Sequence, residues 1–248
     1  MSQRLVLEVC VESVESAVAA EQGGAHRVEL CSALADGGVS PSAGLIAVVR
    51  QRIQIPMHVM IRPRASDFCY SQDEFAVMQR DLLMAKHLGA DGVVLGILDL
   101  DGKIDIQRTK QLVALAAPMQ VTFHRAFDMS GDLICSLRDL QITGIHRILT
   151  SGGKQTAVEG AEMLKKLVES ANGSIGIMAA SGIDAHNVAE LLQRTGVREV
   201  HASLRSTLAS SMRYQNEQVS MGATKGREYQ RFVADQQKVR TLLSAACY

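Results

Sequence analysis

A five-residue step that begins with glycine occurs four times in this chain of 248 residues and restricts the fold more than any other feature. The step is glycine, an apolar residue, any two residues, then Val or Ile, and it occurs at Gly24–Val28, Gly89–Val93, Gly144–Ile148 and Gly196–Val200. Glycine suits a helix end with positive φ, and the apolar residues that follow are typical of a buried parallel strand. A second repeat, Pro-Met-x-Val, opens two more strands at Pro56–Val59 and Pro118–Val121. The two repeats predict helices that alternate with parallel strands.

The repeats and the apolar segments between them predict strands at residues 5–10, 27–31, 57–62, 92–96, 120–124, 147–151, 174–180 and 199–203. Helical patterns occupy residues 13–22, 41–53, 72–88, 105–117, 131–142, 154–171 and 184–195, and a last amphipathic segment, 228–245, supplies a C-terminal helix. This alternation predicts an α/β fold, the (β/α)₈ TIM barrel. No linker divides the sequence, so we expect one domain over residues 1–248 with a long eighth βα loop at about 204–227. Helix starts are expected at the N-caps Ser40, Ser71, Asp105 and Asp184.

Composition excludes several classes of protein. Lys and Arg balance Asp and Glu at 26 each without a basic cluster, so we expect no nucleic-acid partner. No apolar run reaches the roughly 18 residues that a membrane helix needs, so we expect no membrane partner. Residues 1–4 lead directly into a strand, which leaves no room for a signal peptide. The five cysteines lack a C-x-x-C pair and are odd in number, which favours a reduced, cytoplasmic protein: Cys10, Cys31, Cys69, Cys135 and Cys247.

A Glu-x-Cys pattern closes the first two predicted strands, as Glu8-Val9-Cys10 and Glu29-Leu30-Cys31. Side chains alternate along a strand, so in each pair the acid and the thiol share one face. The intervening Leu, Val and Ile residues form the opposite face, which the helices cover. Two acids and two thiols are therefore expected to lie together at the carboxyl ends of neighbouring strands, where barrel proteins carry their sites.

Alignment of the repeats predicts which other residues face this end of the barrel. Arg62 and His124 end the third and fifth strands, and Ser151 and Ser203 end the sixth and eighth. His201 is expected one layer deeper, at the level of Glu29. Barrel interiors are usually filled by Val, Ile and Leu, so this many inward polar residues predicts a functional site.

Three interpretations of this site compete. In the first, Cys10 and Cys31 bind one soft ion such as Cu(I), because their strands lie about 4.8 Å apart. Met60 would be a further sulfur donor. The alternative is that both cysteines are small buried residues without a ligand. In the second, the turns 150–153 and 180–184 hold an anion, although Asp184 would repel it; the alternative is ordinary tight turns.

The third interpretation is acid–base chemistry. Glu8, Glu29, Arg62, His124 and His201 would face a common centre and bind or protonate a polar substrate. The alternative is a buried ion network in which Arg62 or Arg125 neutralises the two glutamates.

Five strings resemble the CutC family of copper homeostasis proteins: LEVCVES, RVELCSALADGGVSPSAG, HVMIRPRASDFCYS, FHRAFDM and RILTSGG. The resemblance runs from the first strand to the eighth and implies a (β/α)₈ barrel, a cytoplasmic location and a role in copper tolerance through Cu(I). It also implies copper ligands at Cys10 and Cys31. Further shared residues are Arg62, Arg64, Asp67, His124, Arg125 and Asp128.

One stretch departs from the family pattern. Members usually carry three glycines after the seventh strand, where this chain has Ala180-Ser181-Gly182. A Cβ at the first two positions restricts close backbone approach, so whether this turn binds an anion stays open.

Two functions follow as hypotheses. The first is a cytosolic copper homeostasis protein that binds Cu(I) through Cys10 and Cys31 without catalytic turnover. The second is a TIM-barrel enzyme acting on a small anionic or phosphorylated metabolite. In it, Glu8 or Glu29 acts with His124 in acid–base roles, and Arg62 holds the anion. The other candidate ligand-binding residues are Arg125, Asp128, Ser151 and His201. A long eighth loop is usually either a lid or an oligomer contact. A third possibility is therefore an interaction scaffold whose eighth loop mediates homo-oligomerisation, with a dimer favoured.

Overall fold

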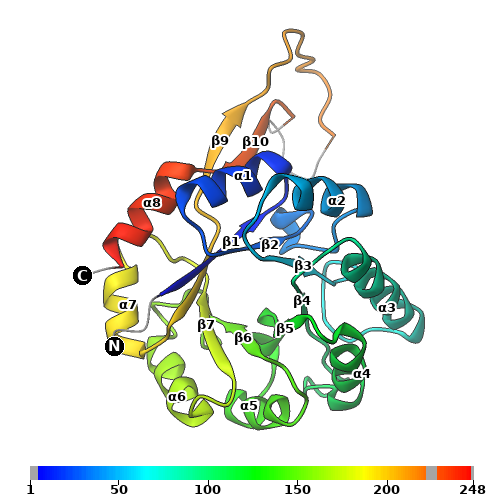
Figure 1. Cartoon of the computed structure of the whole chain (residues 1–248), viewed down its shortest axis with the longest axis vertical. Helices are drawn as coiled ribbons and strands as arrows, with labels where there is room; N and C mark the ends of the chain where they lie inside the picture. Colours follow the sequence, from blue (N-terminus) through cyan, green and yellow to red (C-terminus); the bar gives the residue numbers. More distant parts are fainter. Residues whose placement is uncertain (1–4, 222–227, 247–248) are drawn as a thin grey trace.

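The computed structural model describes residues 5–221 and 228–246, and in it eight parallel strands close into a barrel surrounded by helices (Figure 1). Each strand pairs with its sequence neighbour, and β1 pairs with β8 to complete the ring. The strands are β1 (Val6–Val11), β2 (Arg27–Leu30), β3 (Met57–Met60), β4 (Gly92–Leu95), β5 (Gln120–Phe123), β6 (Arg147–Thr150), β7 (Gly176–Ala180) and β8 (Glu199–Ala202). The (β/α)₈ barrel predicted from the repeats is confirmed.

Helices cover the outside of this barrel, and the main apolar core lies between them and the strands. They are α1 (Val14–Gly23), α2 (Ala43–Arg52), α3 (Gln72–His87), α4 (Ile106–Ala116), α5 (Leu133–Gln141), α6 (Ala161–Ala171), α7 (Val188–Thr195) and α8 (Gln236–Ala245). Among the residues that the structure describes, no helix combines the length and apolar character needed to cross a membrane.

Most of the helices begin at a residue whose side chain caps them, whereas α6 and α7 have no side-chain cap. Ser71 caps α3 in a full capping box with Glu74, and Asp105 caps α4, as predicted. The caps predicted at Ser40 and Asp184 are wrong: Ser42 caps α2, and Asn187 precedes α7. The chain stays extended through Ser42 before α2, and it makes an additional turn at residues 185–187 before α7.

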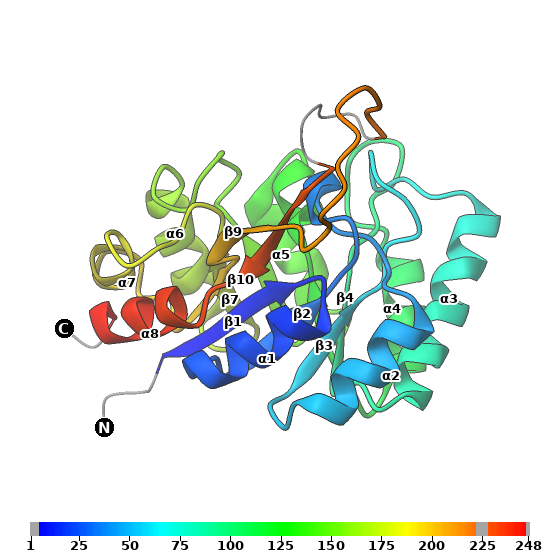
Figure 2. The same ribbon diagram turned by 90° about the horizontal axis from the view of Figure 1, so that it is seen from above.

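The segment that follows β8 contains an antiparallel pair of strands. β9 (Arg205–Ala209) pairs with β10 (Gln230–Ala234). The arm, residues 210–221, follows β9 and extends away from the ring (Figures 1 and 2). The segment 228–245, predicted as one amphipathic unit, is therefore divided into a strand and a helix. Ala234 N–H donates to Ser16 Oγ over 3.1 Å, which ties β10 to α1. Residues 222–227 of the predicted loop, residues 1–4 and Cys247 lie outside the described residues.

Alternation along the strands separates the barrel interior from the helix-facing side. Leu7, Val9 and Val11 of β1 belong to the core under the helices, so Glu8 and Cys10 face inward. In the pairing of β1 with β2, Cys10 lies opposite Glu29, and Cys31 N–H donates to the carbonyl of Val11 over 2.9 Å. The acids and thiols of the two Glu-x-Cys patterns therefore lie on one face, at the carboxyl ends of adjacent strands.

Candidate functional site at the carboxyl end of the barrel

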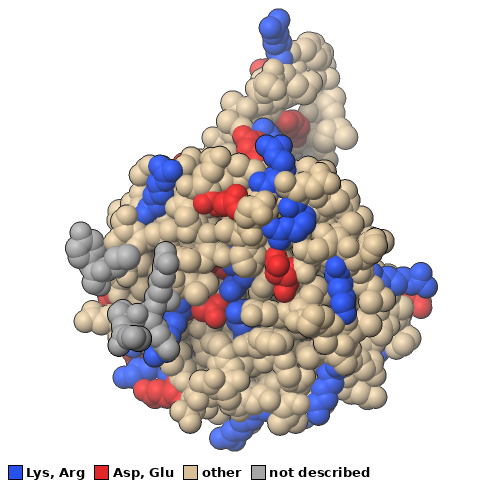
Figure 3. All heavy atoms as spheres, viewed as in Figure 1, with Lys and Arg blue, Asp and Glu red and all other residues tan. Residues whose placement is uncertain are grey.

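The barrel interior holds a buried ion network beneath the candidate site. Arg27 Nε donates to Glu8 Oε2 over 2.5 Å, and Arg27 Nη2 donates to Glu199 Oε2 over 2.8 Å. Arg147 Nε donates to the same Glu199 oxygen over 2.7 Å. Lys/Arg and Asp/Glu atoms appear together at the centre of the ring in Figure 3, and elsewhere on that face the two signs are interspersed. Buried charges persist in proteins only when they are paired in this way.

This network corrects one sequence interpretation and adds residues that it missed. The predicted neutralising residues, Arg62 and Arg125, do not contact Glu8 or Glu29 through any ion pair among the described residues; Arg27 does so for Glu8. Strand alternation contained the signal, because Arg27, Glu29 and Cys31 are spaced two apart. The same spacing relates Glu199 to His201.

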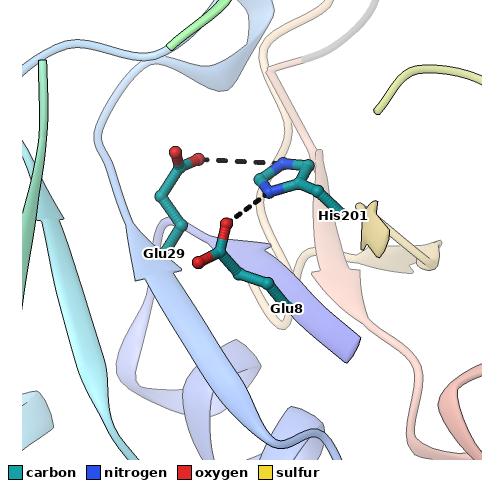
Figure 4. A group of neighbouring side chains, drawn as sticks. All are labelled: Glu8, Glu29 and His201. Atoms are coloured by element: carbon teal, nitrogen blue, oxygen red, sulfur yellow. Dashed lines mark hydrogen bonds and ion pairs between the residues drawn. The ribbon is translucent and has the colours of Figure 1, made fainter. Parts of the chain in front are cut away.

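His201 lies between the two glutamates, as Figure 4 shows. Its Nδ1 is 2.7 Å from Glu8 Oε1, and its Nε2 is 3.8 Å from Glu29 Oε2. The first contact fixes the orientation of the ring, so that Nε2 faces Glu29. The three residues come from β1, β2 and β8, which are neighbours only because the barrel closes.

The three groups of this cluster have shifted pKa values. Burial alone raises the pKa of Glu8, but the charge of Arg27 and the contacts with His201 and His58 outweigh it and hold that pKa far below its usual range. Burial and the nearby charge of Glu8 raise the pKa of Glu29, although His201 opposes them. Burial lowers the pKa of His201, but the charges of Glu29 and Cys10 and hydrogen bonds to Cys10 and Glu8 raise it well above its usual value. Glu8 is therefore the charged anchor of the cluster.

The two cysteines occupy different environments. Cys10 lines the cavity described below, whereas Cys31 is fully buried in a small apolar cluster with Met60 and Val94. The Cys31 thiol donates to Glu29 Oε2 over 3.3 Å. Burial, followed by the charges of Glu29 and Cys10, raises the pKa of Cys31 well above its usual value. Cys10, Cys31, Cys69 and Cys135 are all free thiols.

Arg62 is a buried guanidinium that no described carboxylate neutralises. Its Nη1 donates to the backbone carbonyls of Asp36 and Gly38, and its Nη2 donates to the carbonyl of Ser66. The guanidinium also lies 5.1 Å from the centre of the Phe68 ring. Its Nε is buried and has no hydrogen-bond partner among the described protein atoms.

His124 is held as a neutral ring beside Arg62. Its Nδ1 accepts the N–H of Ala126 over 3.1 Å, so in the neutral ring the proton is on Nε2, which has no described protein partner. Burial and the charge of Arg62 lower the pKa of His124 to about 3. Gly96 makes room for the ring, because a Cβ there would lie 2.5 Å from the imidazole.

Asp128 fills the turn that was predicted to hold an anion. Its carboxylate accepts the backbone N–H groups of Ser151 and Gly153 at 3.0–3.1 Å, and it also accepts the hydroxyls of Thr150 and Ser151. Arg125 Nε donates to the same carboxylate over 2.8 Å. The amides after β6 are therefore satisfied by a side chain of the protein itself. Whether the Ala180–Gly182 turn binds an anion stays a prediction; Ser181 has a left-handed φ of 79° there.

These residues surround a cavity of about 570 Å³ at the carboxyl ends of the strands. This volume is typical of a site for a small organic molecule. The predicted site residues that line it are Cys10, Glu29, Met60, Arg62, His124, Arg125, Asp128, His201 and Ser203. Cys31, Glu8 and Ser151 do not line it and instead contact residues that do. Lining residues that the sequence interpretation missed include Phe68, Met129 and Arg205.

Two sets of residues could in principle hold a metal ion. Among the described residues, one group of three acidic, histidine or cysteine side chains has ligand atoms within 4.8 Å of one another: Glu8, Glu29 and His201. Arg27 and His201 already occupy both oxygens of Glu8, so this group is a hydrogen-bonded cluster and a poor set of free ligands. The sulfur atoms of Cys10, Cys31 and Met60 form the softer alternative.

Fold and site together define a (β/α)₈-barrel protein with a polar, thiol-containing cavity at the carboxyl end of its strands. The CutC family model matches residues 5–206. The chain belongs to the CutC family.

Relatives agree with this assignment over nearly the whole chain. The human "copper homeostasis protein cutC homolog" is 49% identical over 242 residues, which is 97% of this chain and 89% of the human protein. A CutC family protein from Chromobacterium violaceum is 46% identical over 97% of both chains. The crystal structure titled as the putative copper homeostasis protein CutC from Streptococcus agalactiae is 36% identical, with a TM-score of 0.76 over 79% of this chain and 97% of that chain.

Proposed function

We propose that this protein serves copper homeostasis in the cytoplasm by binding Cu(I) through the thiolates of Cys10 and Cys31. The names of the human and mouse relatives support a role in copper homeostasis. The observation that carries the proposal is the pair of free thiols on the inward face of neighbouring chain segments: Cys10 lies opposite Glu29, and Cys31 follows Glu29 by two residues beside Val11.

The donor atoms present fit this ion. Thiolate and thioether sulfur are the ligands that favour Cu(I), and Met60 lies in the same small cluster as Cys31. Thiols must lose their protons to bind a metal, and the thiol of Cys31 already points its proton at Glu29. Cys10 lines the cavity, which gives an ion a route to the pair.

A Cu(I) titration of reduced protein against a colorimetric Cu(I) chelator tests this proposal. We expect the Cys10→Ser and Cys31→Ser variants each to bind Cu(I) at least about 100-fold more weakly, since loss of an outer-shell partner alone costs 10–100-fold. Cys135→Ser is the matched control, because Cys135 is exposed and away from the site, and it should bind as the wild type does. Equal Cu(I) affinity in all four proteins would refute the proposal.

A second candidate function is an enzyme that acts on a small anionic metabolite. The observation that favours it is geometric: Glu8 orients His201, whose Nε2 faces Glu29 beside a cavity of about 570 Å³. An oriented histidine next to a carboxyl group is a common acid–base arrangement.

Mass spectrometry of a small-metabolite extract incubated with the protein tests the second candidate. We expect at least one species to be consumed by the wild type but not by His201→Asn, which keeps an amide near Glu8 and loses Nε2. An extract that stays unchanged with the wild type would count against an enzyme.

A further inference from the structure

We propose that the cavity binds a small organic carboxylate that carries a neighbouring hydroxyl group, with its carboxylate against Arg62 and His124 and its hydroxyl toward Glu29. This ligand is distinct from copper. A molecule of this class would also be the substrate of the enzyme considered as the second candidate function. Turnover of the ligand depends on that candidate function, whereas binding of the ligand does not.

The first argument is the charge of Arg62. Its side chain is buried, with a residue exposure of 6%, and its described polar partners, which are backbone carbonyl oxygens and the Tyr70 hydroxyl, include no carboxylate. The other arginines inside the barrel, Arg27 and Arg147, are each paired with a glutamate. A buried cation without a counter-charge is costly. An anionic ligand in the cavity that Arg62 lines would neutralise it.

The second argument is the set of buried polar atoms that have no protein partner. Around this cavity the described residues include three such atoms: Arg62 Nε, His124 Nε2 and Glu29 Oε1. Each unsatisfied buried group costs roughly 1–3 kcal/mol. Buried polar groups in proteins almost always have a partner, so a ligand that supplied one to all three atoms would be stabilised.

The chemistry of these three atoms specifies the ligand. Arg62 Nε and His124 Nε2 both donate. The two side chains pack against the same Phe68 ring, at 5.1 and 5.0 Å from its centre, so together they suit one acceptor oxygen group. Glu29 Oε1 offers a carboxyl oxygen. A hydroxyl group suits it in either protonation state, because a hydroxyl both donates and accepts.

The same cavity is less suited to a phosphate monoester. Backbone amides at loop ends supply most phosphate contacts in barrels, and Asp128 already occupies the amides of Ser151 and Gly153. Two side-chain donors match the smaller charge of a carboxylate.

Glycolate, which has one carboxylate and one hydroxyl, is a minimal probe, and acetate is the same molecule without the hydroxyl. Thermal unfolding is measured with sodium glycolate, acetate, phosphate and chloride at matched ionic strength. At ten times its Kd, glycolate should raise the Tm by about 3 °C, and acetate at the same concentration should raise it less.

Variants assign the response to residues. His124→Asn keeps an acceptor for Ala126 N–H and removes the Nε2 donor, so it should weaken glycolate binding about tenfold or more. Arg62→Gln should do the same, with circular dichroism to verify that it folds. His87→Asn and Arg80→Gln are matched controls on the exposed surface of α3, and both should respond as the wild type does.

Three results would overturn the inference: a response to glycolate no larger than to chloride, a response to phosphate larger than to glycolate, or a response to glycolate that survives His124→Asn. The Cys10→Ser/Cys31→Ser double variant separates this inference from copper binding. It should keep the response to glycolate even though it loses Cu(I).

Discussion

At the scale of residues, the charged interior of the barrel determines how the site is oriented. Arg27 joins Glu8 and Glu199, and Glu8 in turn holds His201. Parallel barrels usually fill these layers with Val, Ile and Leu. The same interior holds two neutral histidines: burial lowers the pKa of His58 and of His124 to about 3 each. These side chains make the stability of the fold depend on pH.

Replacement of His124 by Asn should reduce the pH dependence of stability. The pKa of His124 is about 3 in the folded chain and about 6.5 in an unfolded one. Between these values the unfolded chain binds a proton that the folded chain does not, so stability falls as the pH falls. The group contributes up to about 1.4 kcal/mol per pH unit, which His124→Asn should remove.

Urea unfolding at several pH values between 4 and 6.5 measures this difference. The exposed residue His87 provides the control, and His87→Asn should keep the slope of the wild type. Equal slopes for the wild type and His124→Asn would show that His124 is protonated in the folded protein.

At the scale of elements, the loop from Ser151 to Gly160 has a conformation that the sequence pattern did not predict. The pattern from 154 predicted a helix, but α6 begins at Ala161. Gly152 and Gly153 have positive φ, at 70° and 71°, and wrap the chain around Asp128. The sequence does contain the glycines. It does not indicate that the carboxylate they surround comes from Asp128, more than twenty residues earlier, because that contact depends on the closed barrel.

Gly160→Ala should destabilise the protein, whereas Gly131→Ala should not. A Cβ at Gly160 would lie 1.8 Å from the backbone oxygen of Ser151, which cannot move without disturbing the Asp128 turn, while Gly131 has no atom within 4 Å of that position. We expect Gly160→Ala to lose at least about 2 kcal/mol in urea unfolding. Gly131→Ala should stay within about 1 kcal/mol of the wild type. Similar losses in both would refute this view of the loop.

At the scale of the whole molecule, local repeats were enough to predict the barrel. The four glycine steps and the two Pro-Met-x-Val steps mark six strands, and apolar segments indicate the other two. Eight alternating strand and helix units have one familiar closed arrangement. Alignment of the repeats also located the carboxyl ends of the strands, and therefore most of the residues that line the cavity. The pairing of β9 with β10 was not predicted, since it joins segments that neither repeat covers and the intervening chain has no periodicity.

The arm, residues 210–221, leads to a prediction about assembly. It extends from the ring and carries exposed large apolar side chains at Met212, Tyr214 and Met221, exposed by 58%, 75% and 85%. Exposed apolar groups of this kind often mark an interface between proteins. If a second copy covers them, sedimentation should give a dimer for the wild type and a monomer when all three are replaced by Ser. A triple variant that sediments as the wild type does would remove the arm from the interface.

X-ray absorption at the copper edge of the Cu(I)-loaded, reduced protein tests the central claim most directly, because it identifies the atoms bound to the ion. The soft donors of Cys10, Cys31 and Met60 predict a shell dominated by sulfur, which Cys10→Ser and Cys31→Ser should each deplete. A shell of nitrogen and oxygen only, such as Glu8, Glu29 and His201 would supply, would contradict the account.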